Sequence, residues 1–266
     1  MLGVTGLFVY PLKSARGIAL REATLSDRGF VHDRRFMAVS PDGGMLTQRT
    51  VPALARIETA LTHDALRLSV DGLRAEVPLA PRPGMPLRVR VFQDFVDDAW
   101  DLGDTYAAFL TEALGQPARL VHMPDAARRP VNPKYAADGE GVGFADGFPY
   151  LLTSEASLEA LNQVLEQPVG MERFRPNLVI RGVDAWAEDD FGPLRVGDVA
   201  FEAVKPCSRC VIINTDQTTG AREKGTLEGL SRTHLLEKRA IFGQNLLARG
   251  TGTVRVGDPV TLLPRG

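Results

Sequence analysis

The feature that most constrains the fold is a pair of alternating segments joined by a two-residue turn. Residues 66–70 (LRLSV) and 73–77 (LRAEV) alternate apolar and polar side chains, and Asp71-Gly72 lies between them. A period of two places the apolar side chains on one face of a strand, and Asp-Gly favours the tight turn of an antiparallel hairpin. Further strands are predicted at residues 36–39 and 87–91. The first hundred residues are therefore predicted to form a β-barrel or sandwich.

Three segments predict helices. The first begins at Asp104, whose carboxylate can accept hydrogen bonds from the free amides of the first turn, and ends at Gly115. The second is capped by Ser154, and its leucines at 158, 161 and 165 form a stripe that faces the core. The third extends over residues 227–248, with interruptions at two glycines. A buried strand is predicted at residues 178–180.

A short local repeat predicts the architecture of the second half. Residues 195–199 (RVGDV) recur almost unchanged as 255–259 (RVGDP), each with Gly-Asp between apolar segments. We interpret them as two related hairpins of a second barrel. Residues 124–147 are polar and rich in Gly and Pro, which is typical of a long functional or mobile loop. The chain is therefore predicted to have a β-rich α+β fold of two modules, with helices mainly in the second.

Composition excludes several classes of protein. The 266 residues agree with about two domains, at roughly 150 residues per domain. Lys plus Arg total 31 against 33 Asp plus Glu, which excludes a globally basic binder of nucleic acid or of membrane surfaces. The N-terminus lacks the pattern of a signal peptide, and no apolar run approaches the ~18 residues of a membrane-spanning helix. We expect a soluble cytoplasmic protein.

The two cysteines, Cys207 and Cys210, give the strongest indication of chemistry. A thiolate is both a soft metal ligand and a strong nucleophile. A structural zinc site needs about four ligands, and the chain has no second cysteine pair and no closely spaced histidine pair. A thioredoxin-like pair begins a helix, whereas residues 211–213 (VII) predict a strand. Burial as two small apolar residues is disfavoured by the adjacent Lys, Ser and Arg, so a thiolate that binds a metal-bearing cofactor remains.

Three other segments place isolated cations beside turn residues. They are residues 10–14 (YPLKS), 32–36 (HDRRF) and 174–177 (FRPN). Lys and Arg beside Ser or backbone amides suit a phosphate, which Arg can bind through two nitrogens. Each cation taken alone is better explained as a solvated surface charge, and spacing along the chain does not show that they converge.

These motifs together resemble the MOSC proteins, the molybdenum-cofactor sulfurase C-terminal superfamily, in their two-part form. Within that group the chain is most similar to bacterial relatives of the mitochondrial amidoxime-reducing component. The matching segments are VYPLKS (9–14), DRRF (33–36), LTSEASL (152–158), FRPN (174–177), CSRC (207–210) and VGDPV (256–260). The resemblance covers nearly the whole chain. It implies an N-terminal β-barrel module at residues 1–118 and a MOSC β-barrel domain with peripheral helices at residues 119–266.

The resemblance also implies a pyranopterin molybdenum cofactor. In the family's pattern the second cysteine ligates the metal, which here is Cys210, while Cys207 matches the non-ligating position. The family's Asp near the metal corresponds to Asp146, which is followed here by Gly147 and Phe148 where the family has two small hydroxyl residues. The cofactor contacts of the family fall on Lys13, Ser14, Arg34, Arg175, Asn177, Ser208 and Arg209.

By the same resemblance, the expected activity is reduction of small N-hydroxylated compounds to amine or amidine plus water. Cys210 would be the metal ligand, and Asp146 would deliver a proton or orient the substrate. Because the chain has no further cysteines for a cluster, we expect a separate flavin, haem or iron–sulfur electron donor, and we expect a monomer. Two alternatives remain: a cofactor carrier or sulfur-transfer module without turnover of its own, and a β-rich binding protein without a cofactor.

Overall fold

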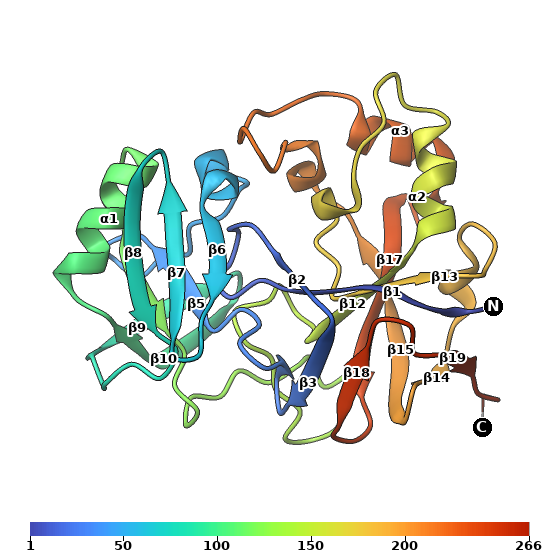
Figure 1. Cartoon of the computed structure of the whole chain (residues 1–266), viewed down its shortest axis with the longest axis horizontal. Helices are drawn as coiled ribbons and strands as arrows, with labels where there is room; N and C mark the ends of the chain where they lie inside the picture. The colour runs from blue at the N-terminus through green and yellow to red at the C-terminus, as the bar shows by residue number, and fades with distance from the viewer. Residues whose placement is uncertain (266) are drawn as a thin grey trace.

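Strands account for most of the regular structure and form four sheets in the computed structural model, which describes residues 1–265 (Figure 1). The largest sheet has nine strands and lies in the lobe that holds both chain termini. In spatial order its strands are β19 (Val260–Leu262), β14 (Pro193–Val196), β15 (Val199–Ser208), β17 (Arg239–Ala248), β12 (Tyr150–Ser154), β13 (Leu178–Arg181), β1 (Gly3–Val9) and β2 (Ile18–Leu20), with β16 (Leu235–Leu236) beside β17. The predicted β-rich α+β class is confirmed.

The other lobe contains two small sheets and one helix. The predicted hairpin is present: Val70 pairs with Leu73 across a turn in which Asp71 and Gly72 both have positive φ angles. One sheet consists of β6 (Glu58–Leu61), β7 (Ala65–Val70) and β8 (Leu73–Pro78), and the other of β5 (Phe36–Val39), β11 (Arg119–His122), β10 (Asp94–Asp101) and β9 (Met85–Val91). A further three-stranded sheet joins β18 (Thr253–Arg255), β3 (Glu22–Ser26) and β4 (Gly29–Phe30).

The helices are short and cover the sheets. They are α1 (Asp104–Leu114), α2 (Glu155–Asn162) and α3 (Thr226–Thr233), with 3₁₀ turns at Pro52–Arg56, Met171–Arg173, Ala187–Asp190 and Val211–Asn214. Ser154 caps α2 as predicted, because its hydroxyl accepts a hydrogen bond from the Ser157 amide at 3.1 Å. The helix predicted between Gly103 and Gly115 is confirmed, but the capping role predicted for Asp104 is not found. Gly103 is the N-cap of α1, and Asp104 lies inside the helix with its carboxylate 3.1 Å from Arg119.

Residues 227–248 are not one helix, which corrects the sequence prediction. Only α3 is helical, and residues 239–248 form the long strand β17 between β12 and β15. A strand with neighbours on both sides and cover on both faces has an almost continuous apolar sequence, which periodicity cannot distinguish from a buried helix segment. Gly243 marks the difference, since its φ of 81° is incompatible with a continuing helix.

The second copy of the local repeat is also not a hairpin. In the first copy Val196 pairs with Val199, so β14 and β15 form the predicted hairpin. In the second copy β18 pairs with β3 and β19 pairs with β14. Proline at position 259 has no amide hydrogen for the pairing that Val199 makes, which explains why two similar sequences adopt different partners.

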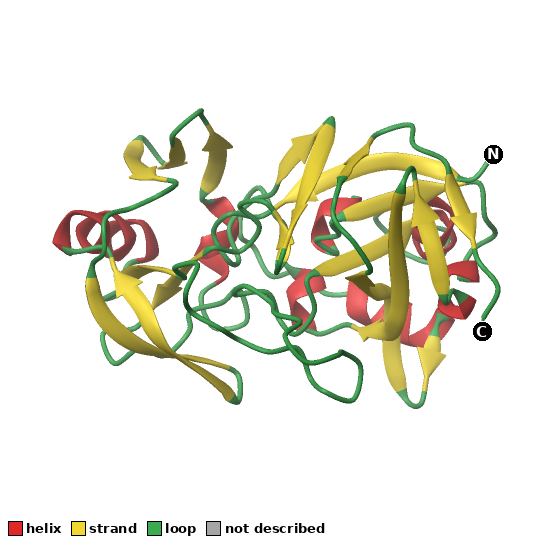
Figure 2. Cartoon of the chain, turned by 90° about the horizontal axis from the view of Figure 1, so that it is seen from below, coloured by secondary structure: helices red, strands yellow, loops and turns green. Residues whose placement is uncertain are grey.

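Each lobe contains a strand from the part of the sequence that mainly forms the other lobe. β1, at the N-terminus, is the neighbour of β13 in the large sheet, while β11 pairs with β5 and β10 in the other lobe. The boundary proposed between residues 118 and 119 stays a prediction. Loops occupy much of the region between the lobes (Figure 2), and the segment between β11 and β12 contains no helix or strand. In the described part of the chain, no helix has the length and apolar character needed to cross a bilayer.

Gly243 allows a test of how tightly β17 is packed. A Cβ at this position would meet the Leu152 carbonyl oxygen and would lie 2.8 Å from the Thr153 side chain. We expect Gly243→Ala to lower the free energy of unfolding by about 2 kcal/mol or more, through backbone strain and overlap. The matched control is Gly139→Ala, which has a similar φ of 89° but open space around the added carbon. Urea denaturation measures both, and equal losses would contradict the packing argument.

Candidate functional site

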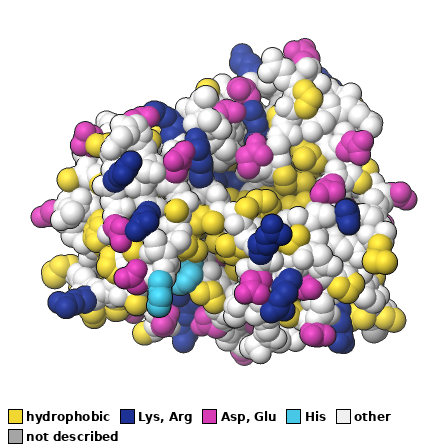
Figure 3. All heavy atoms as spheres, viewed as in Figure 1, with side chains coloured by type: hydrophobic (Ala, Val, Ile, Leu, Met, Phe, Trp, Pro, Cys, Tyr) yellow, Lys and Arg dark blue, Asp and Glu magenta, His cyan; other side chains and the backbone are white. Residues whose placement is uncertain are grey.

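A cavity of about 130 Å³ between the lobes contains all nine residues that the sequence analysis placed in one site. Its wall includes Lys13, Ser14, Arg34, Asp146, Arg175, Asn177, Ser208, Arg209 and Cys210, together with Cys207 and Arg49. Figure 3 shows the surface hollowed between the lobes, with Lys and Arg side chains near the hollow. Segments more than 190 residues apart in the sequence therefore meet at one place.

The end of β15 sets the position of the two cysteines. Two bulges interrupt its pairing with β17, one between Ala203 and Lys205 and one between Pro206 and Ser208. The next residues form a 3₁₀ turn that begins after Cys210, so the strand predicted at residues 211–213 is absent. The chain turns because the Ile213 amide bonds to the Cys210 carbonyl at 3.2 Å instead of pairing with a strand.

Both thiols are free and partly accessible. Cys207 and Cys210 are intermediate in exposure, so full burial as apolar residues does not describe them. Within residues 1–265 no three His, Cys, Asp or Glu side chains gather in a way that could hold a metal ion, so nothing there favours the zinc alternative. The Arg209 guanidinium donates to the Cys207 sulfur at 2.9 Å and to the Phe174 carbonyl at 2.7 Å, which ties the cysteine segment to the turn before β13.

Two arginines contact the ring of one tyrosine. The guanidinium carbons of Arg34 and Arg175 each lie 4.3 Å from the centre of the Tyr10 ring. Tyr10 is buried and donates to the Pro176 carbonyl at 3.0 Å, and burial raises the pKa of its hydroxyl to about 12. Arg34 also pairs with the buried carboxylate of Asp33 at 2.6 Å. The ring therefore contacts two cations, of which Arg34 is paired with a carboxylate.

Three cavity residues have backbone conformations that side chains usually avoid. Ser14, Arg34 and Arg175 have φ angles of 69°, 47° and 57°. Each left-handed non-glycine residue costs about 1 kcal/mol or more and persists only where the surrounding structure enforces it. All three residues line one cavity, which indicates that the fold tolerates this unfavourable backbone energy because it orients the three side chains toward the cavity.

Asn177 has a different environment from the other cavity residues. Its amide nitrogen donates to the Phe8 carbonyl at 3.1 Å, and its amide oxygen accepts from Arg34 at 3.1 Å and from the Leu151 amide at 3.3 Å. These bonds join β1, β12 and the segment before β13. The side chain lines the cavity, but its hydrogen bonds are made with other protein atoms and hold these segments together.

Lys13 and Asp146 form an ion pair at the cavity wall. The Lys13 ammonium lies 2.7 Å from the Asp146 carboxylate and 2.6 Å from the Phe144 carbonyl oxygen. The lysine side chain is 5% exposed and the aspartate side chain 61% exposed, so the carboxylate faces the open space. Burial lowers the pKa of Lys13 to about 8 against the opposing effect of Asp146. Burial also acts to raise the pKa of Asp146, but Lys13 and Arg49 outweigh it and hold that pKa well below its usual range.

Arg49 is a cavity residue that the sequence analysis missed. It comes from the segment after β5, places Nη2 3.3 Å from the Asp146 carboxylate, and lies 4.8 Å from the centre of the Phe92 ring. Nothing in its local sequence distinguishes it from a solvated surface arginine. The only signal in the sequence was that Arg49 lies close to a hydroxyl residue, Thr47, as the cations in the other three segments lie close to turn residues.

The cavity carries an excess of positive charge. Lys13 and four arginines line it, whereas Asp146 is the only carboxylate among the lining residues. Three of those arginines have a buried nitrogen with no hydrogen-bond partner: Nη1 of Arg49, Nη2 of Arg175 and Nε of Arg209. Buried donors normally find acceptors, so unpartnered ones that converge on a cavity indicate a site for an anionic ligand. The sulfur of Cys210, a soft metal ligand, lies in the same cavity wall.

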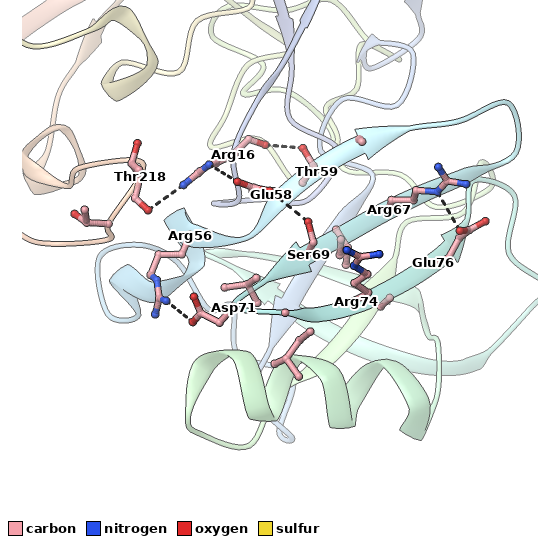
Figure 4. Close-up of a pocket in the computed structure, with 17 residues that line it drawn as sticks. Arg16, Arg56, Glu58, Thr59, Arg67, Ser69, Asp71, Arg74, Glu76 and Thr218 are labelled. Carbon is pink, nitrogen blue, oxygen red and sulfur yellow. Dashed lines mark hydrogen bonds and ion pairs between the residues drawn. The ribbon is translucent and has the colours of Figure 1, made fainter.

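A larger hollow, of about 1200 Å³, lies over the outer face of β6, β7 and β8 (Figure 4). It is less suited to an anion, because three of its four arginines already bind carboxylates. The pairs are Arg16 with Glu58, Arg56 with Asp71, and Arg67 with Glu76. The hollow also contains no cysteine. Charge and chemistry therefore favour the smaller cavity as the functional site, despite its size.

Comparisons with known proteins support the resemblance stated from the sequence. Residues 1–117 match the family described as "MOSC N-terminal beta barrel domain", and residues 140–261 match "MOSC domain". The chain is 35% identical over 280 residues to mitochondrial amidoxime-reducing component 1 of Homo sapiens, which covers 98% of this chain and 82% of that protein. It is 34% identical over 279 residues to mitochondrial amidoxime reducing component 2 of Rattus norvegicus, with 97% and 82% coverage. A molybdenum cofactor sulfurase of Danio rerio is 30% identical over 257 residues, which are 86% of this chain and 30% of that protein.

The lowered pKa of Lys13 predicts a pH dependence of stability. Between about pH 8 and the ordinary value of 10.5, the unfolded chain keeps a proton that the folded chain has released, so the free energy of unfolding rises with pH. Lys13→Met removes this contribution. Urea denaturation from about pH 7.5 to about pH 10 should show wild type gaining stability relative to the variant. An unchanged difference across that range would contradict the assignment, and Lys238→Met, in an exposed turn, is the control.

Proposed function

Because this chain belongs to the MOSC family and carries that family's N-terminal β-barrel domain, we propose that it is a molybdenum-cofactor-dependent oxidoreductase that reduces N-hydroxylated compounds. Two full-length relatives are named for reducing amidoximes, which are N-hydroxylated amidines. The observation that carries the proposal is the cavity in which unpartnered arginine nitrogens surround a free thiol. An anionic cofactor with a thiophilic metal matches both features.

The residues present fit such a cofactor. The unpartnered nitrogens of Arg49, Arg175 and Arg209 would donate to its phosphate and pterin oxygens, and Lys13, Ser14, Arg34 and Ser208 stand in the same wall. Cys210 would ligate the metal through its sulfur, and Cys207 is engaged by Arg209. When bound, the group supplies the two-electron chemistry that breaks an N–O bond.

The residues around the thiol have separate parts in the reaction. In the overall change an N-hydroxyl compound takes up two electrons and two protons, the N–O bond breaks, and amine or amidine and water form. Asp146 is held ionised by Lys13 and Arg49, so it acts as a hydrogen-bond acceptor that orients the substrate N–H or hydroxyl. Lys13 contacts this carboxylate at 2.7 Å and helps to keep it ionised, so we assign Asp146 to orienting the substrate rather than to delivering a proton.

The proposal also covers the electron donor, the substrate and the location of the protein. Two electrons per turnover would come from a separate flavin, haem or iron–sulfur protein, and the substrate would be a small N-hydroxylated compound. The net charge of -2 makes nucleic acid an unsuitable partner. A cytoplasmic location and a monomeric state remain part of the proposal.

The similarity to a molybdenum cofactor sulfurase favours a second candidate function, a cofactor carrier or sulfur-transfer module. That similarity covers only 30% of the sulfurase, against 82% of the amidoxime-reducing relatives. The two functions differ in turnover. Protein made in a host that synthesises pterin cofactors, analysed for molybdenum and given a chemical reductant, consumes an N-hydroxylated substrate only under the first.

Exchange of each cysteine tests the assignment of the metal ligand. Cys210→Ser should retain less than about a hundredth of the reductase activity, because the hard hydroxyl replaces the soft thiolate. Cys207→Ser should keep much of the activity, since this thiol contacts Arg209 and is assigned no metal bond. Activity per bound molybdenum, with the reductant in excess, is the measurement. Equal loss in both variants would indicate a dithiol mechanism instead.

Retention of the cofactor tests the role of the unpartnered arginine nitrogens. Arg175→Gln should lose cofactor at least about tenfold more readily during dialysis, because it removes a charged donor from the cavity. Arg173→Gln is the matched control: that buried arginine pairs with Glu223 and does not line the cavity. Molybdenum content after dialysis and urea denaturation are measured together. Full retention in Arg175→Gln would remove this residue from the cofactor site.

A further inference from the structure

Two aromatic rings and two lysines gather next to the cavity; Phe148 is the member of this group that lines the cavity, and Lys205 lines another hollow. Phe148 lines the cavity and meets Tyr135 edge to face, with ring centres 5.6 Å apart. The Lys205 ammonium lies 5.2 Å from the centre of the Tyr135 ring and 6.0 Å from that of Phe148. Lys134 lies 5.4 Å from the Tyr135 ring. We call these four residues the aromatic–lysine cluster.

The cluster has positive charge without a matching carboxylate. Neither Lys134 nor Lys205 takes part in any of the ion pairs found among residues 1–265. Lys205 is half-buried, and its ammonium lies over two ring faces rather than beside a carboxylate. Contact with a ring face stabilises an ammonium group less than contact with a carboxylate does. The ammonium groups therefore remain free to bind an anion.

The ring of Phe148 is held in place while the space beside it stays open. Its inner side packs with Val204 on a core cluster that includes Val142 and Leu247. A Cβ added at Gly147 would meet no atom within 4 Å, so the backbone between Asp146 and Phe148 borders free space. A ligand whose reacting group contacts Asp146 could thus lay a flat body against the Phe148 ring.

From this arrangement we propose that the aromatic–lysine cluster is a substrate subsite for N-hydroxylated compounds that carry an aromatic ring with an anionic substituent. This inference rests on the function proposed above and adds the class of substrate. The ring of the substrate packs on Phe148, which offers a flat apolar surface close to the cationic residues of the cavity. The anionic substituent binds the Lys205 ammonium. An acidic surface on the electron donor is the competing occupant of these lysines, and the test below separates the two.

Three probes measure the proposal on the cofactor-loaded protein: acetamidoxime, benzamidoxime and 4-carboxybenzamidoxime. Wild type should have the highest kcat/KM for the carboxylated probe and the lowest for acetamidoxime. Phe148→Leu, which keeps packing but removes the ring, should lower kcat/KM about fivefold for both aromatic probes and little for acetamidoxime. Lys205→Met should lower it about tenfold for the carboxylated probe only. Lys238→Met, in an exposed turn that lines neither the cavity nor the larger hollow, is the matched control.

The outcomes distinguish the two proposals. Turnover of all three probes without discrimination, or with discrimination unchanged in both variants, would overturn the subsite and leave the reductase function intact. If Lys205→Met raises the KM for the electron donor and leaves the preference among probes unchanged, the lysines bind the donor and the inference is wrong. Titration calorimetry of 4-carboxybenzamidine measures the subsite without turnover. Weaker binding to Phe148→Leu and Lys205→Met supports the subsite even if no probe is reduced, whereas unchanged binding contradicts it.

Discussion

The structure depends on keeping several cations close together in a partly desolvated cavity. Five cationic side chains face one carboxylate there, and mutual repulsion would disperse them if they stood on flexible surface segments. The Tyr10 ring separates and supports two guanidinium groups, Asp33 fixes Arg34, and Asp146 lies within reach of both Lys13 and Arg49. The two carboxylates offset part of the positive charge. The excess of donors that remains suits the cavity to an anionic ligand.

The arrangement of strands supplies the rigidity that this concentration of charge needs. β1 belongs to the large sheet and β11 to a sheet of the other lobe, so the chain crosses between the lobes, and buried Gln48 donates to Gln217 across the junction at 2.9 Å. Residues from the N-terminal lobe, such as Arg49, can therefore face the cysteine segment at fixed distances. The left-handed conformations at Ser14, Arg34 and Arg175 fit this view, because strain of that kind survives only in a rigid frame.

Local sequence predicted those elements whose causes are local. The Asp71-Gly72 hairpin and the Ser154 cap are present because turn geometry and capping involve neighbouring residues only. The predictions for β17 and for residues 211–213 failed for the opposite reason. Burial on both faces hid the period of β17, and the bond of the Ile213 amide to the Cys210 carbonyl curled an apolar run that is typical of a strand. The role of Arg49 was missed because a single arginine has no periodic signal.

By itself the sequence determined the β-rich class, the family, and the residue types of the site, since turn signals, motif order and the chemistry of thiol and guanidinium are properties of short segments. Only the tertiary structure decided which charges share a cavity and which nitrogens have no partner. It also decided that Arg209 engages Cys207, and that two lysines stand beside Tyr135 and Phe148 without a carboxylate. The reason is physical: electrostatic pairing and burial depend on distance through space, and β-sheet pairing sets those distances between segments that are remote along the chain.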